Sequence, residues 1–296
     1  MRDDLCILIS TCDRYRDLAD FTRAQIESKW PVHPPIFVCG IRNVQDGLEL
    51  RDDPANWMQV TRSACMDLRT KGFQKAYLIL EDHPPFGPCH SGHLNDTLPR
   101  AMEHFNATCM ALSGPGQHRK QHGSPKNFAR YTFDHIHPDA LWKFPLHPAL
   151  WNLDRLIALL DWLIETLPVT EQNPWAFERK GGDPKAALTP ELKEGSYRVI
   201  GSQMPSRPFF WLRRMPLALL QFVVDVARFL IRIILGDEAR RLADEKLWGI
   251  YCPYDGPYPL FWSGIMRKGR LSEDLVFWLA ITGRSRFLES LPPSCK

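Results

Sequence analysis

The residues best suited to chemistry are Glu81, Asp82 and His83, which directly follow a short apolar run at 76–80. An apolar run of this length is typical of a strand buried on both faces of an α/β sheet. Side chains after such a strand project into the crevice at its carboxyl end, where α/β sheets bind ligands. The pattern indicates a metal or nucleotide site here. The alternative is a solvated loop, because acids and prolines are common loop residues.

The composition limits the classes of protein to consider. The chain has 296 residues, of which 44% are hydrophobic and 24% charged, which is typical of a globular protein with a substantial core. A net charge of +3 is too small to indicate a general nucleic-acid-binding surface, so we expect no nucleic-acid partner. Eight cysteines without a CxxC pair indicate a reducing compartment, and the N-terminal apolar run is too short for a secretory signal. We therefore expect a cytoplasmic protein.

The first part of the chain alternates strand-like and helix-like runs. We expect strands at 5–10, 35–40, 76–80 and 107–112, and helices at 18–26, 57–68 and 94–105. The connections are long enough for helical crossovers, so the alternation predicts a parallel sheet of the doubly wound type.

The middle of the chain begins with a polar stretch at 114–123 that has no apolar periodicity. This stretch is either a solvated surface loop or a lid that meets phosphate through His118, Arg119 and Lys120. Farther along, Asn152 is a good N-cap for a helix at 153–167. A short helix then begins near residue 173, and a strand is expected at 197–201.

Residues 217–235 form an apolar helix with a narrow polar stripe. Polar residues recur at spacings of four, three and four, and these residues are Gln221, Asp225, Arg228 and Arg232. Three charges within this length disfavour a transmembrane span. The helix is therefore expected to be buried in a core or dimer interface, or to lie on a membrane surface. The arginines flanking it would favour the membrane surface, and they are Arg213, Arg214, Arg240 and Arg241.

Several segments in chain order resemble bacterial GT-A-fold glycosyltransferases of polysaccharide and lipopolysaccharide biosynthesis. The segments are Thr11–Tyr15, Leu80–His83, Leu146–Trp151, Asn173–Glu178 and Tyr258–Gly269. The third is similar to the family's "slQpaiW" segment, the fourth to its "PWxFE" segment, and the last to its closing element. The chain departs from the family where Glu81-Asp82-His83 replaces the usual DxD motif, which leaves metal dependence open.

The resemblance implies a donor site for a nucleotide sugar. Thr11 and Asp13 would hydrogen-bond the base or ribose, although simple helix capping is the alternative. Asp82 would be the first ligand of a divalent cation, Mn²⁺ or Mg²⁺, with Glu81 and His83 as companions. The cation would neutralise the leaving diphosphate.

The resemblance also implies where the acceptor and the base would lie. Glu178 would be the general base of an inverting transfer, against the alternative of an acid that faces a helix dipole. Lys268 would contact the diphosphate or the acceptor together with Arg267 and Arg270, or belong to a solvated cluster.

Four other residues are weaker candidates. His147 and Trp151 flank an apolar patch that could hold a sugar, but core packing is the better expectation for Trp151. His90 and His93 stand three apart near the acids, and the sequence identifies no third metal ligand for them.

Taken together, the sequence predicts a GT-A-like α/β protein, related to the Rossmann fold, with a mostly parallel sheet flanked by helices and a helical C-terminal portion. Residues 1–113 would form the nucleotide-sugar-binding half. Residues 114–208 would form the acceptor and catalytic half of the same domain, and 209–296 an apolar helix with a closing segment.

The expected function is transfer of a sugar from a nucleotide-sugar donor to a glycan or lipid-linked acceptor. The protein would be cytoplasmic, with peripheral attachment to the inner membrane through residues 209–235 as an open possibility. Two other functions stay open from sequence. One is an inactive GT-A-like binding or assembly protein, and the other is a nucleotidyltransferase, which would release pyrophosphate.

Overall fold

The structure is a computed structural model of the whole chain. It describes residues 2–42, 48, 52–53, 55–112, 124, 126–129, 131–140, 143–183, 185–200, 217–246, 257–260, 264–267, 269–273, 275–276, 279 and 286–295. All structural statements below concern these residues.

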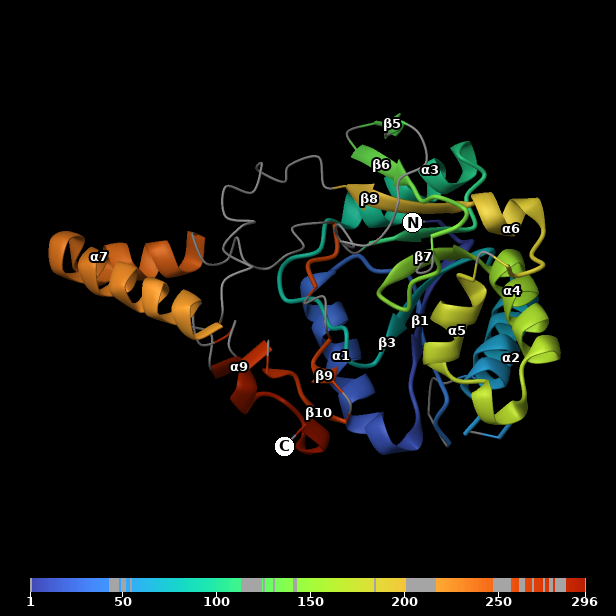
Figure 1. Ribbon diagram of the computed structural model, residues 1–296, viewed down its shortest axis with the longest axis horizontal. Helices are drawn as coiled ribbons and strands as arrows, with labels where there is room; N and C mark the ends of the chain where they lie inside the picture. The colour runs from blue at the N-terminus through green and yellow to red at the C-terminus, as the bar shows by residue number, and fades with distance from the viewer. Residues whose placement is uncertain are drawn as a thin grey trace.

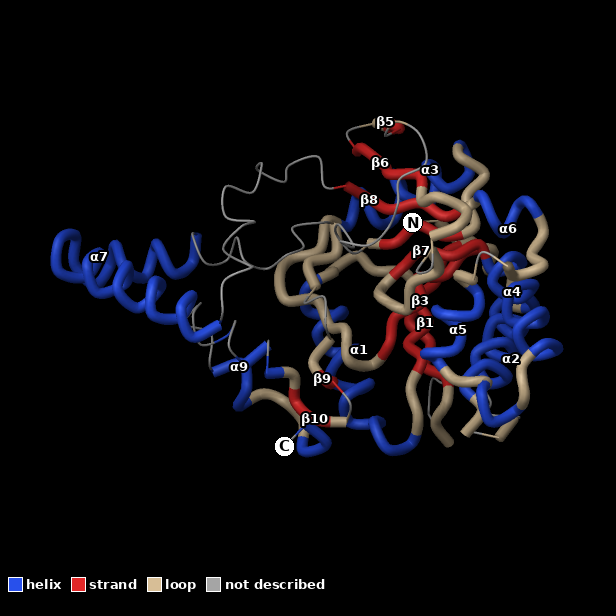
Figure 2. The backbone as a smooth tube through the Cα atoms, in the orientation of Figure 1, coloured by secondary structure: helices blue, strands red, loops and turns tan. Residues whose placement is uncertain are grey.

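An eight-stranded sheet forms the centre of the protein (Figures 1 and 2). The strands are β1 (Leu5–Ser10), β2 (Ile36–Cys39), β3 (Lys75–Leu80), β4 (Cys109–Ala111), β5 (Lys126–Phe128), β6 (Tyr131–His135), β7 (Ala149–Asn152) and β8 (Ser196–Ile200). Their order is β2-β1-β3-β7-β4-β8-β6-β5. The pairings show that β6 and β7 run against the other strands, so the sheet is mixed with most strands in one direction.

Helices cover both faces of the sheet (Figure 1). The helical elements in the described part of the chain are η1 (Asp13–Tyr15), α1 (Arg16–Lys29), α2 (Trp57–Thr70), the π-helical turn η2 (His93–Thr97), α3 (Leu98–His104), α4 (Leu153–Thr166), η3 (Val169–Glu171), α5 (Pro174–Gly181), α6 (Pro190–Glu194), α7 (Leu217–Lys246), α9 (Arg286–Glu289) and η6 (Pro293–Cys295). A small hairpin of β9 (Met266–Arg267) and β10 (Arg270–Leu271) lies in the C-terminal part.

The two faces of β1 show how the sequence makes two cores. Side chains alternate along a strand, so Leu5, Ile7 and Ile9 share one face and Cys6 and Leu8 the other. The first set packs with buried residues of α1 and α3. The second set packs with buried residues of α2, α4 and α5. This two-faced burial explains why β1 reads as a continuous apolar run.

Two asparagines begin the helices that the sequence predicted. The Asn152 side chain accepts a hydrogen bond from the Arg155 amide at 3.1 Å, and Asn173 accepts one from the Ala176 amide at 3.0 Å. Each cap satisfies an amide that has no partner inside the helix. The predicted starts of α4 and α5 are therefore confirmed.

Three strands of the eight-stranded sheet were not expected from sequence. They are β5, β6 and β7, and β7 enters α4 without an intervening loop. Its pairing with β3 places Leu78 opposite Ala149 and Lys75 opposite Asn152. From sequence only the helix after Asn152 is expected here, because four residues are too few to show strand periodicity.

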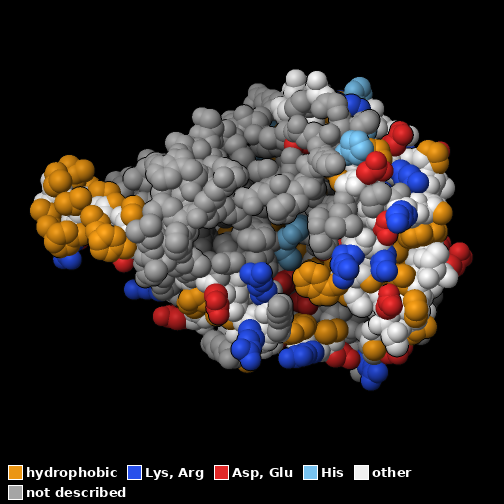
Figure 3. Space-filling model, in the orientation of Figure 1, with side chains coloured by type: hydrophobic (Ala, Val, Ile, Leu, Met, Phe, Trp, Pro, Cys, Tyr) orange, Lys and Arg blue, Asp and Glu red, His pale blue; other side chains and the backbone are white. Residues whose placement is uncertain are grey.

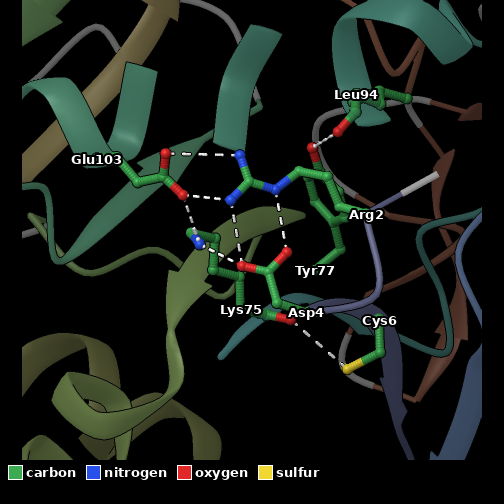
Figure 4. Close-up of polar contacts among 7 residues, drawn as sticks. All are labelled: Arg2, Asp4, Cys6, Lys75, Tyr77, Leu94 and Glu103. Carbon is green, nitrogen blue, oxygen red and sulfur yellow. Dashed lines mark hydrogen bonds and ion pairs between the residues drawn. The ribbon is translucent and has the colours of Figure 1, made fainter. Parts of the chain in front are cut away.

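The amino ends of β1 and β3 are joined by a network of charges (Figure 4). Lys75 is almost fully buried, and its Nζ lies 2.7 Å from Asp4 Oδ2 and 2.9 Å from Glu103 Oε1. Arg2 pairs with both carboxylates. Burial opposes ionisation of Asp4, but hydrogen bonds from Arg2 and Lys75 lower its pKa to about 2. The network fixes α3 to the sheet at the edge opposite the acids of residues 81–83.

Helix α7 projects away from the sheet (Figure 1) and presents a mass of hydrophobic side chains at one end of the molecule (Figure 3). It bends at Gly236, whose φ of 86° lies in the left-handed region. The side chains described in its first arm are largely exposed, so the expectation of burial in this chain's core is wrong. No helix in the described part of the chain is both long and apolar enough to cross a membrane.

Candidate functional site

The carboxyl ends of β1 and β3 lie side by side and bring the first candidate residues together. The parallel register pairs Ser10 with Leu80, and the Glu81 amide donates to the Ser10 carbonyl at 3.3 Å. Thr11 therefore lies beside Glu81. The Thr22 hydroxyl of α1 donates to the Glu81 carbonyl, which fixes the start of the turn after β3. The predicted position of the acids at the end of a buried strand is correct.

A second histidine joins the acids because β7 is antiparallel to β3. Residues that precede β7 lie at the same edge as residues that follow β3. His83 Nδ1 lies 2.7 Å from Asp82 Oδ1, and His83 Nε2 lies 3.2 Å from His147 Nδ1. The rings of His83 and His147 meet edge to face. We call Asp82, His83 and His147 the acid–histidine chain.

Glu178 reaches the same region from α5. Its Oε1 accepts a hydrogen bond from the Leu146 amide at 2.7 Å, directly before His147. Glu178 is therefore bonded to the segment that carries His147, and it is not merely an acid that faces the helix dipole. Trp175 lies one helical turn earlier and is 68% exposed, while Phe177 is buried against Trp57 and Trp151.

The C-terminal segment closes over the end of β3. The Ile265 amide donates to the Asp82 carbonyl at 2.7 Å, and the Tyr258 hydroxyl donates to the His83 carbonyl at 2.9 Å. Gly264 has a φ of 70°, and a Cβ there would lie only 2.3 Å from Asp82 Oδ2. Only glycine allows this close approach to the carboxylate. The resemblance pointed to this segment, but its contact with Asp82 came from the structure.

The first strand-to-helix turn borders the closing segment. A Cβ at Gly269 would lie 3.7 Å from Tyr15 Oη and 3.9 Å from Arg14 Nη2. Asp13 is exposed, and the Arg42 amide donates to its Oδ1 at 3.1 Å. This backbone hydrogen bond lowers the pKa of Asp13. Neither η1 nor α1 has a side-chain cap, so the capping alternative for Thr11 and Asp13 is wrong.

Burial makes Glu81 an unusual acid. Desolvation, and then repulsion from Asp82, raises the pKa of Glu81 from 4.5 to about 8. A perturbed acid at the carboxyl end of a strand is typical of functional sites, although structural acids are also perturbed in this way. At neutral pH, Glu81 is therefore mostly protonated.

The residues fit the expected divalent cation only in part. Asp82 offers carboxylate oxygens, which hard cations prefer. The buried His83 Nδ1 lies 2.7 Å from Asp82 Oδ1 without a hydrogen bond, and His83 Nε2 faces His147, so His83 fits the role of metal ligand poorly. The described residues contain no group of three or more His, Cys, Asp or Glu side chains arranged to hold a metal ion. Metal binding by Asp82 stays a prediction.

Other predicted residues have different outcomes. Trp151 is fully buried and packs against Phe144 and Phe177, which confirms the expectation that it belongs to the core. His90 and His93 stack on each other with ring centroids 5.7 Å apart. Arg267 and Arg270 are exposed on β9 and β10. The residues outside the described part of the chain are His118, Arg119, Lys120, Arg213, Arg214 and Lys268.

No protein-family model matches the chain, and no curated protein sequence matches it either. The fold and site define an α/β protein with acids, histidines and a closing segment at one sheet edge. The resemblance to GT-A glycosyltransferases rests on the sequence motifs alone.

Proposed function

We propose that the protein is a GT-A-like glycosyltransferase that moves a sugar from a nucleotide-sugar donor to a glycan or lipid-linked acceptor, with inversion. One observation carries this proposal. Segments distant in sequence meet at a single edge of the sheet, where α/β proteins bind nucleotides. They supply the β1–α1 turn, the acid–histidine chain, a glutamate on a separate helix and a segment that contacts Asp82 and His83.

The donor would lie between the β1–α1 turn and the closing segment. Thr11 and Asp13 would meet the nucleoside, and their position directly after β1 at this edge supports this assignment. The diphosphate carries negative charge, and the exposed Arg14 approaches the closing segment near Gly269, close in sequence to Arg267 and Arg270. Arginine is suited to phosphate because its guanidinium donates several hydrogen bonds in one plane. Lys268 remains a candidate for the same task.

Glu178 is the candidate base for the transfer. The acceptor hydroxyl forms a bond to the anomeric carbon while the bond from that carbon to the phosphate oxygen breaks. The proton of the hydroxyl passes to the Glu178 carboxylate, and the electron pair of the broken bond leaves on the diphosphate. Oε1 already accepts the Leu146 amide, so this contact holds the carboxylate in place. The exposed ring of Trp175, one turn away, offers a flat apolar surface for the acceptor.

A divalent cation would supply charge neutralisation at the leaving diphosphate, and Asp82 would hold it with Glu81 as companion. Glu81 would have to release its proton to bind a cation, because its raised pKa keeps it mostly neutral at pH 7. His83 instead positions His147 relative to Asp82.

The test combines donor binding with product analysis. Thermal unfolding would be followed with UDP, GDP, CDP and CMP, with and without Mn²⁺, since a ligand that binds the folded state raises its stability. The stabilising nucleotide then selects nucleotide sugars for hydrolysis and transfer assays. Release of a nucleoside diphosphate or monophosphate with sugar transfer supports the proposal. Pyrophosphate release would indicate a nucleotidyltransferase, and binding without turnover an inactive binding protein.

Asp82→Ala locates the donor site. The variant is expected to keep its fold and to lose nucleotide-dependent stabilisation, because Asp82 follows a strand and is not part of the apolar core. Asp20→Ala, which removes an exposed acid of α1, is the matched control. Wild-type donor affinity and turnover in Asp82→Ala would remove this residue from the site.

A further inference from the structure

The first arm of α7 exposes a broad apolar face. Large side chains recur at spacings of four, three and four, which places them on one side of the helix, and these residues are Phe222, Val226, Phe229 and Ile233. Val223, Leu230 and Ile234 widen the same face. Ile234 is 71% exposed, Phe222 65% and Ile233 64%. Monomeric proteins in water rarely expose an apolar patch this continuous.

The polar residues of the arm lie on the opposite side. Asp225 and Arg232 occupy a narrow stripe, and Arg232 Nε lies 3.1 Å from Asp237 Oδ1 just beyond the bend. A helix with a wide apolar face, a charged stripe and too many charges to span a bilayer has the form of an interfacial helix. The first arm ends at the bend at Gly236.

Charge indicates what covers this face. Residues 209–235 contain four arginines and one aspartate, a net charge of +3. The whole chain also has a net charge of +3, so the remaining residues balance to zero. The segment that contains the apolar face and the residues just before it is therefore positively charged. Anionic lipid surfaces attract such segments, whereas a second copy would repel them.

Aromatic residues flank the projection in sequence. Phe209, Phe210 and Trp211 precede α7, and Trp248 and Tyr251 follow it. Tryptophan and tyrosine concentrate at membrane–water interfaces, where one part of the ring is apolar and another is hydrated. Outside α7, the exposed large hydrophobic residues in the described part of the chain lie on separate elements, and they are Val32, Met66, Val169 and Trp175.

We infer that the first arm of α7 is a membrane-docking element that lays its apolar face into one leaflet of a bilayer containing anionic lipid. The body of the protein then remains in water beside the membrane, because the hydrophobic projection is confined to one end of the molecule (Figure 3). This inference does not depend on glycosyl transfer, since it rests only on the exposed face and its charge.

The experiment uses the full chain and extruded vesicles of phosphatidylcholine with or without phosphatidylglycerol. Co-sedimentation is expected with the anionic vesicles and is expected to weaken in high salt, since the charge attraction is screened. Phe222→Gln/Phe229→Gln/Ile233→Gln is expected to lower the bound fraction at least about tenfold through lost apolar burial. Arg213→Glu/Arg214→Glu is expected to weaken binding to anionic vesicles only.

The matched control is Val32→Gln/Met66→Gln/Val169→Gln, which removes three exposed hydrophobic residues from the body and is expected to bind vesicles like wild type. Equal thermal midpoints for the two triple variants show that lost binding is not lost folding. Single Phe229→Gln serves if the triple variant unfolds. The inference is overturned if wild type ignores both vesicle types. It is also overturned if wild type is a dimer that the α7 variant converts to monomer without any change in vesicle binding.

Discussion

Glu178 is the residue whose role is easiest to isolate, because its contact with the backbone survives a change to glutamine. In the wild type, the Leu146 backbone amide donates a hydrogen bond to Glu178 Oε1 at 2.7 Å. In Glu178→Gln, the side-chain oxygen of the glutamine can still accept this hydrogen bond. The glutamine side chain cannot take up the proton of the acceptor hydroxyl at neutral pH. We expect donor affinity to persist and the transfer rate at saturating donor to fall at least about 100-fold, the usual scale for a general base. Calorimetry and initial-rate assays measure the two quantities separately.

His147 is the natural comparison for Glu178. It lies one residue from the bonded amide and is held by His83. If His147→Gln abolishes transfer while Glu178→Gln keeps near wild-type turnover, the base is His147 and Glu178 only positions its segment. Asp154 is a poor substitute for either, because it pairs with Arg69 between α4 and α2.

The raised pKa of Glu81 should make the stability of the fold depend on pH. Its pKa is about 8 in the folded protein against an ordinary value of 4.5, so the unfolded chain releases the proton first as the pH rises. Folded stability should therefore fall between about pH 4.5 and 8 and then level off. One pKa unit corresponds to about 1.4 kcal/mol, so the loss is expected to be a few kcal/mol at most. Urea unfolding at pH 5, 7 and 9 measures it.

Glu81→Gln should flatten this dependence, because glutamine has no proton to release. Glu165→Gln changes an exposed acid of α4 and should leave the wild-type slope unchanged. A wild-type slope in Glu81→Gln would assign the dependence to another group.

At the scale of elements, the contact between the closing segment and β3 depends on Gly264. Gly264→Ala would place a methyl group 2.3 Å from Asp82 Oδ2 in a left-handed conformation. We expect a loss of about 2 kcal/mol or more in unfolding free energy, together with weaker nucleotide binding, because strain and steric overlap add. Denaturant unfolding and calorimetry check both effects.

Gly72→Ala is the control that measures only the cost of placing a side chain in the left-handed backbone conformation. Gly72 has a φ of 95° and open space around its Cβ position, so its variant should lose only about 1 kcal/mol and should bind nucleotide normally. Equal losses in the two variants would show that the Gly264–Asp82 contact is unimportant.

At the scale of the whole molecule, nucleotide and cation should stabilise the fold together. We expect the thermal midpoint to rise with nucleoside diphosphate and Mn²⁺, and the Mn²⁺ requirement to depend on Asp82. His83→Gln should leave the Mn²⁺ concentration for half-maximal stabilisation unchanged, since both nitrogens of His83 face protein groups. Asp82→Asn should raise that concentration about tenfold or more. The opposite ranking would make His83 the ligand.

Much of the local structure followed from the sequence. The strands at the N-terminal end of the chain and the helices after Asn152 and Asn173 have strong local signals, because buried strands require continuous apolar runs and caps require specific side chains. The acids at the end of β3 could be identified for the same reason. β5, β6 and β7 could not, because their short runs become strands only by pairing with distant neighbours.

The sequence by itself determined the α/β class, the acids at a strand end and the amphipathic form of α7. Each of these depends on side-chain period or on residues adjacent along the chain. Only the tertiary structure decided that His147 meets His83, that Glu178 holds the segment before His147, that Gly264 covers Asp82 and that the face of α7 is exposed. Strand direction and the path of distant segments create these contacts, and neither is encoded in local spacing.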